Sequence, residues 1–226
     1  ELEKTTLYQL GTHYSTNTGM GIDLTLFFKE MSDLVETGTF THSRVGDYAL
    51  FTSTGTAESR GLEIQFQGDD VGFFSWQSSY TLSKVTGSSS HPMQDYLYTI
   101  AGEQNMDPDQ YLDWDQRHTV QATVSMQVPR GRGMTIAGSR VFQGVGVTFG
   151  WEYGSGFPYT YRPSYSPGLL DEVNTYRYPT TSEAVLKIDK QFWFDSFTMN
   201  AWCEITNLFN SHNVVDIQNT SWYLAH

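Results

Sequence analysis

Apolar and polar residues alternate along eight segments of the chain, each close to the length of a bilayer-crossing β-strand. The alternation is clearest in residues 119–128, where apolar side chains hold the even positions and Thr, Gln or Ser the odd ones. Because successive side chains of a strand point to opposite faces, each segment predicts a strand with one apolar and one polar face. The predicted strands lie at residues 7–14, 22–29, 62–67, 74–82, 119–128, 145–154, 186–194 and 198–205.

The connections between these strands differ in length in a regular way. Those after the first, third and seventh strands are short turns, and the fifth, at 129–144, is intermediate, while those after the second, fourth and sixth run to tens of residues. Short turns at one end and long loops at the other are typical of outer-membrane barrels, whose long loops are extracellular. The pattern therefore predicts an all-β fold, an antiparallel transmembrane β-barrel.

Composition is compatible with this fold and excludes one class of partner. The longest apolar runs, such as 26–28, are far shorter than the roughly 20 residues of a membrane-spanning helix. Barrel strands need only about 9 to 11 alternating residues, so the low mean hydropathy of -0.41 does not argue against a membrane location. The net charge of -12 repels a phosphate backbone, which excludes nucleic acid as an expected partner.

Six short segments in a fixed order carry a further signal. They are 6–11 (TLYQLG), 26–35 (LFFKEMSDLV), 60–63 (RGLE), 113–118 (DWDQRH), 155–160 (SGFPYT) and 207–210 (NLFN). Each is weak alone, but their order and spacing resemble the C-terminal half of TonB-dependent receptors. The resemblance is strongest to the group with carboxypeptidase-like N-terminal extensions found in Bacteroidetes and relatives, and it runs along the whole chain.

The resemblance implies transport without a chemical step, so we do not expect an enzyme, and no cofactor is implied. Receptors of this family lie in the outer membrane of Gram-negative bacteria and import a scarce nutrient of the siderophore, cobalamin, glycan or peptide class. The implied partners are outer-membrane lipid and lipopolysaccharide, the remainder of the receptor with its plug and N-terminal strands, and the TonB complex, which acts through the plug.

Parts of the family pattern have no counterpart in this chain. The plug domain, the first part of the barrel wall and the closing strand, which ends in an aromatic residue, are missing, and the chain stops at Ala225 and His226. We therefore expect residues 1–226 to be the C-terminal part of one β-barrel domain, with about eight strands of a larger, 22-stranded type of barrel.

Two alternatives stay open at this point. Eight strands can close around a side-chain-filled interior, so the chain could be a self-contained small outer-membrane barrel with a structural or adhesive role. The missing terminal aromatic strand argues against this reading. A soluble β-sandwich with binding loops would instead bury the apolar faces against each other, and solubility without detergent would distinguish it.

The loop at 85–116 is rich in acidic residues and contains neither lysine nor arginine. Asp107 and Asp109, together with Asp113 and Asp115, could place oxygen atoms around a Ca²⁺ ion. The interpretation that we favour is structural: Asp113 and Asp115 hydrogen-bond the base of the loop, and the other carboxylates are solvated.

A second loop, after residue 154, combines tyrosine with proline and predicts a stiff aromatic surface. Such a surface could stack on a sugar or chelate ligand, although tyrosines also gather at membrane interfaces whatever the cargo. Taken with the acidic loop, it gives these ligand-binding candidates: Asp107, Asp109, Trp114, Tyr159, Tyr161 and Tyr165.

The remaining motifs favour neither catalysis nor a metal site. The six histidines are scattered, without a pair at zinc-ligand spacing, and no nucleophile elbow, phosphate loop or dinucleotide fingerprint occurs. The single cysteine, Cys203, is read as a small apolar residue of the barrel wall.

Basic residues mark the predicted periplasmic end. Arg130, Arg132 and Arg140 cluster in the 129–144 connection, where a solvated charged turn is the default interpretation and contact with periplasmic proteins an alternative. Lys190 falls on the predicted lipid face, where a charge costs about 2 to 4 kcal/mol at the bilayer midplane and little near an interface. We therefore expect Lys190 near the same rim.

Overall fold

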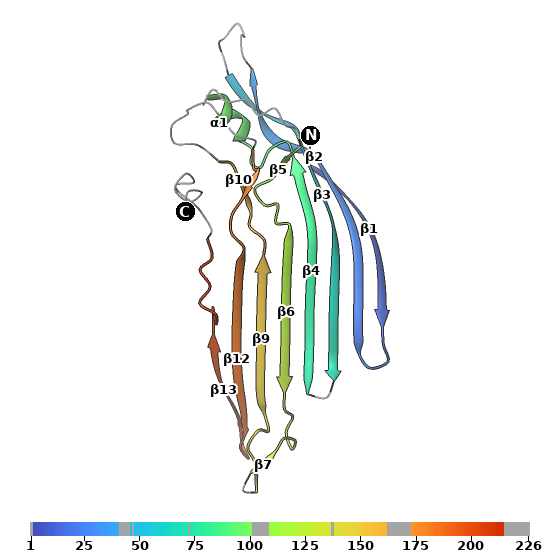
Figure 1. Cartoon of the computed structure of the whole chain (residues 1–226), viewed down its shortest axis with the longest axis vertical. Coiled ribbons are helices and arrows are strands. Elements are labelled where there is room, and N and C mark those ends of the chain that lie inside the picture. The colour runs from blue at the N-terminus through green and yellow to red at the C-terminus, as the bar shows by residue number, and fades with distance from the viewer. Residues whose placement is uncertain are drawn as a thin grey trace.

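One large antiparallel sheet dominates the computed structural model, which describes residues 2–40, 46, 48–71, 73–100, 109–136, 138–161 and 173–214. Its strands follow the order β1-β2-β3-β4-β6-β9-β12-β13, and a ninth, β5, pairs with β4. Figure 1 shows the long strands side by side in one layer. The long strands are β1 Lys4–Ser15, β2 Met20–Phe40, β3 Tyr48–Val71, β4 Phe74–Gly87, β6 His118–Gln127, β9 Val145–Gly154, β12 Thr181–Trp193 and β13 Thr198–Ile205.

All eight predicted strands are therefore confirmed, as is the all-β antiparallel fold. The other elements are short and lie in the connections, where no period-two pattern marks them: α1 Gln94–Ile100, β5 Gln110–Tyr111, β7 Thr135–Ile136, β8 Ser139–Arg140, β10 Pro158–Tyr159 and β11 Tyr176–Arg177. In the described part of the chain, no helix is long and apolar enough to cross a membrane.

The long connection predicted after the second strand is wrong. β2 and β3 continue as a paired hairpin as far as Phe40 and Tyr48, so most of the expected loop is strand. The pairing is irregular between Met31 and Val35, where Asp33 adopts a left-handed φ of 58°. A bulge changes which side chains share a face, so the alternation cannot be followed across it. Figure 1 shows this hairpin extending past the ends of the other strands.

The two faces of the sheet differ in polarity. Directly paired residues of neighbouring strands lie on the same face, and the apolar positions pair with one another across the whole sheet. One apolar row contains Leu24, Ile64, Tyr80, Val120 and Tyr153. Another contains Trp76, Val124, Phe149, Leu186 and Ile205. A polar row between them, on the opposite face, contains Gln67, Gln77, Thr123 and Gly150.

The strands are inclined to the line that joins the short turns. A row of directly paired residues runs from Ser15, at the end of β1, to Val185 in β12. β12 continues eight residues further, to Trp193, before its own turn. With about 3.3 Å per residue and about 4.8 Å between strands, this offset over six strand spacings inclines the strands by roughly 40° from the perpendicular to the line of turns.

The sheet is open. β1 pairs with β2 and β13 pairs with β12, but these two outer strands do not pair with each other in the described part of the chain. Many large apolar side chains are exposed, including Leu10 at 72% and Tyr8 at 59%. The small buried core lies instead at the loop end, where Ala57, Val85 and Leu112 pack together against Met31 and Leu34.

Candidate ligand-binding site

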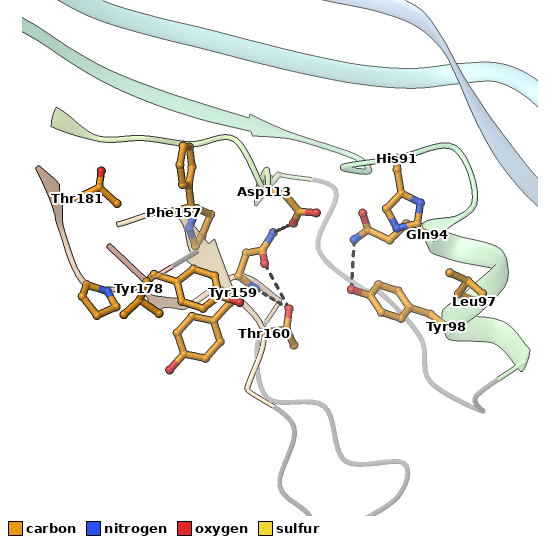
Figure 2. A pocket seen from close by; sticks show the side chains of 14 residues that line it. His91, Gln94, Leu97, Tyr98, Asp113, Phe157, Tyr159, Thr160, Tyr178 and Thr181 are labelled. Carbon is orange, nitrogen blue, oxygen red and sulfur yellow. Dashed lines mark hydrogen bonds between the residues drawn. The ribbon is translucent and has the colours of Figure 1, made fainter. Parts of the chain in front are cut away.

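A cavity of about 560 Å³ lies at the loop end of the sheet. One wall comes from α1 and the residues before it, and the other from β10 and the segment after β11. Figure 2 shows Gln94 and Tyr98 on the helix side and Phe157, Tyr159 and Tyr178 on the opposite side. The volume lies within the range of about 300 to 1,000 Å³ that is usual for small-molecule sites.

The base of this site is organised by the buried carboxylate of Asp115, whose side chain is 0% exposed. It accepts a hydrogen bond of 2.6 Å from the backbone N–H of Val85. Arg117 Nη2 lies 3.2 Å from Asp115 Oδ2, and Arg177 Nη2 bonds the same oxygen. Two guanidinium groups therefore compensate one buried charge, which joins the end of β4 to the start of β6 and to β11.

Tyr111 packs beneath the same cations. Its ring centre lies 5.0 Å from Arg117 Cζ, 5.5 Å from Arg177 Cζ and 5.2 Å from Lys84 Nζ. Burial by itself lowers the pKa of Arg117, but Tyr111 and Asp115 outweigh it and hold that pKa above its ordinary value. The Arg117 guanidinium group therefore stays charged, and both guanidinium groups are engaged in holding the loops.

Asn174 joins the two walls. Its Nδ2 donates to the carbonyl of Tyr111 at 2.7 Å and to Asp113 Oδ1 at 2.8 Å, while its backbone N–H donates to Thr160 Oγ1 at 3.1 Å. The residue is buried and has a left-handed φ of 57°, a conformation that asparagine tolerates better than most residues. These bonds fix the tyrosine-rich segment against the acidic loop.

A second amide chain fixes the helical wall. Gln94 Nε2 donates to Tyr98 Oη at 3.3 Å and to Gln110 Oε1 at 3.2 Å, and its Oε1 accepts from the backbone N–H of Ser90 at 2.6 Å. Gln110 in turn donates to the carbonyl of Ser88 at 2.7 Å. With the amides engaged in this way, the aromatic faces and the exposed Asp113 are the groups that a ligand would meet first.

The structure describes two of the three tyrosines that we predicted as ligand-binding residues. Tyr159 is buried and lines the cavity, with its ring centre 4.7 Å from that of Tyr178 and 5.9 Å from that of Tyr176. Tyr161 continues the cluster at 5.7 Å from Tyr176 without lining the cavity. Tyr165 lies outside the described residues.

The structure describes part of the acidic prediction. Asp115 hydrogen-bonds the base of the loop at Val85, as we favoured, whereas the Asp113 carboxylate accepts a hydrogen bond from Asn174 in the second loop. Asp109 and Trp114 are exposed and do not line the cavity, and Asp107 lies outside the described residues. Within the part of the chain that the structure describes, no group of three or more His, Cys, Asp or Glu side chains could hold a metal ion.

Sequence reasoning missed Gln94, Tyr98, Asn174 and Arg177. The helix that carries Gln94 and Tyr98 has only seven residues, too few for a periodic pattern to stand out. Arg177 is paired with an acidic residue 62 positions away, and nothing in the spacing of the sequence signals such a contact.

The likeness to a known family rests on the motifs alone. Neither a comparison with models of known protein families nor a search of curated proteins finds a match for this chain. The resemblance to TonB-dependent receptors therefore stays a prediction, and the function has to be argued from the geometry described above.

Proposed function

We propose that this chain forms part of the transmembrane wall and the ligand-capturing loops of an outer-membrane transporter of the TonB-dependent receptor type. The observation that carries the proposal is the apolar face that continues from strand to strand across one layer of sheet. Exposure of this face to water is unfavourable. Exposed apolar patches of that extent mark surfaces that contact lipid or another protein layer.

Three features favour lipid as that contact. The strands are inclined by roughly 40° from the perpendicular to the line of turns, and the strands of membrane barrels are inclined by about 35 to 45° from the barrel axis. The opposite face is polar, as the wall of a wet lumen must be. The helix α1 and the short strand β10, which line the cavity, lie at one end of the sheet, and the short turns lie at the other (Figure 1).

The two alternatives have less support. A closed eight-stranded barrel requires β1 to pair with β13, whereas the described strands leave both as edges. A sandwich requires a second sheet over the apolar face, and in the described part of the chain the remaining two sheets have only two short strands each. The open, inclined sheet is better explained as a sector of a wider barrel.

The cavity supports the part of the proposal that concerns transport. A concave site with aromatic walls at the extracellular end is suited to first capture of a nutrient, which the complete receptor would then pass inward with energy from the TonB complex. Outer-membrane lipid and lipopolysaccharide would surround the wall. Siderophore, cobalamin, glycan and peptide stay open as cargo classes.

Paired cysteine variants test the wall. In a Cys203→Ser background, Val124→Cys and Thr123→Cys are neighbours in β6 on opposite faces. In detergent-free outer membranes or proteoliposomes, we expect Val124→Cys to react with a lipid-soluble maleimide and Thr123→Cys with a water-soluble one. Equal reaction of both variants with the water-soluble reagent would contradict a lipid-facing apolar surface.

A ligand screen tests the cavity. Cyanocobalamin, a ferric catecholate, maltotriose and a tetrapeptide represent the four cargo classes, and a bound compound should raise the Tm of the detergent-solubilised chain. Tyr178→Ala should abolish that rise, because Tyr178 lines the cavity, while Trp114→Ala should retain it, because Trp114 does not. A rise lost in Trp114→Ala and kept in Tyr178→Ala would move the site elsewhere.

A further inference from the structure

The connection between β6 and β9 differs in charge from the rest of the chain. Residues 128–144 contain Arg130, Arg132 and Arg140 and no acidic residue, although the whole chain has 25 acidic and 13 basic residues. The three side chains are exposed, and in the described part of the chain no ion pair joins any of them to a carboxylate. A concentrated positive charge thus lies at the short-turn end.

This connection is held firmly in place. Val128 N–H donates to the carbonyl of Val145 at 2.9 Å, and Gln191 N–H donates to the carbonyl of Gly144 at 2.8 Å. Gly144 has a φ of 70°, and a Cβ there would lie 2.6 Å from the ring of Trp193, so only glycine fits. Arg130 lies over the same Trp193 ring at 5.4 Å. The two ends of the connection and the Arg130 side chain are therefore fixed against β9 and β12.

Large apolar side chains accompany the arginines. Met134, Ile136, Val141 and Phe142 are all exposed, with Met134 reaching 60%. Exposed apolar side chains without the arginines would favour contact with any nonpolar surface. Apolar side chains interspersed with arginine and free of acidic residues form the combination that binds at the headgroup boundary of an anionic bilayer.

Lys190 shows where the apolar face ends. It pairs with Val145 and Ala201, so it lies on the apolar face of the sheet. Its Nζ donates to the carbonyls of Val141 and Gln143 in the connection, so it lies at the short-turn end, which we predicted to be the periplasmic rim. A lysine in this position is expected at the edge of the hydrocarbon layer, which puts the arginine-bearing connection at the level of the lipid phosphates.

Resting on the proposed function, we propose that this turn, residues 128–144, binds the headgroups of anionic phospholipids in the leaflet on the short-turn side. The arginines contact the phosphates, and the exposed apolar side chains enter the upper acyl region. The contact fixes the depth of this sector of the wall and holds acidic lipid against it.

Lipid competition on the whole chain tests this. In native mass spectrometry of the detergent-solubilised protein, we expect dioleoyl-phosphatidylglycerol to be retained about a hundredfold more than dioleoyl-phosphatidylcholine. The variant Arg130→Gln/Arg132→Gln/Arg140→Gln should lose most of this preference, since each basic residue near an anionic surface contributes about fivefold. The control Lys4→Gln/Lys29→Gln/Arg60→Gln removes three positive charges from β1, β2 and β3 and should keep it.

Arg132→Gln alone guards against misfolding of the triple variant, because the exposed Arg132 side chain makes no hydrogen bond, ion pair or ring contact with the described residues. It should lower the preference by about fivefold with an unchanged circular dichroism spectrum. Equal retention of both lipids by the wild type, or equal loss in the control, overturns the inference and leaves an acidic protein as the partner of this turn. A chain that is monodisperse without detergent would overturn the proposed function as well. Failure of the lipid inference and failure of the proposed function therefore give different results.

Discussion

At the scale of single residues, Asp115 has the largest structural role in the loop region. Its carboxylate is fully buried and shared by two guanidinium groups that are themselves about 30% exposed. Breaking a buried pair costs about 3 to 5 kcal/mol, and the partial exposure of both arginines lowers this to about 2 to 3 kcal/mol for Asp115→Asn. Amide hydrogen exchange across residues 109–118 should report that loss of local stability.

Asp113→Asn is the matched control for that change. Asp113 is exposed, and the new side-chain oxygen can still accept the hydrogen bond from Asn174 Nδ2. Its effect should stay within about 0.5 kcal/mol. Equal effects of the two substitutions would show that the charge of Asp115 has no special role in holding the loops.

At the scale of elements, α1 is coupled to the hairpin of β2 and β3 by charge. Burial, followed by the nearby carboxylate of Glu36, raises the pKa of Asp95, while His91 lowers it by a smaller amount. The docked helix therefore binds this proton more tightly than the unfolded chain does. Its stability is full below the ordinary value of 3.8 and falls as the pH rises through the raised pKa.

The substitution Asp95→Asn should remove this pH dependence. Protection of the α1 amide protons, corrected for intrinsic exchange rates, should decline with rising pH in the wild type and stay level in the variant. Parallel declines in both proteins would assign the effect to another group near the helix.

How far the elements could be predicted depended on their length and regularity. The eight alternating strands follow from their own residues, because period two needs no knowledge of the partner strand. The extension of β2 beyond Asp33 did not, because the bulge breaks the period, and neither did the pairing of Arg177 with Asp115. Tyr159 was within reach because aromatic clustering is visible locally, whereas Asn174 acts through contacts that only the fold creates.

At the scale of the whole molecule, the described residues leave an apolar face of the sheet and both of its edge strands exposed. Unpaired edge strands invite pairing with other chains, so the chain should aggregate when detergent is withdrawn. Sedimentation velocity in buffer with and without detergent measures this directly. A monodisperse monomer in plain buffer would favour the soluble sandwich and contradict the membrane wall.

The hairpin of β2 and β3 is much longer than the thickness of a bilayer. β3 has 24 residues, about 80 Å at about 3.3 Å per residue, while the apolar band of a membrane barrel is only about 25 Å tall. Even when inclined, its far end would lie tens of ångströms outside the bilayer. On the proposed function, antibodies and phage would meet Phe51 and its neighbours well before they met the cavity, so this hairpin would be the first part of the protein that they could bind.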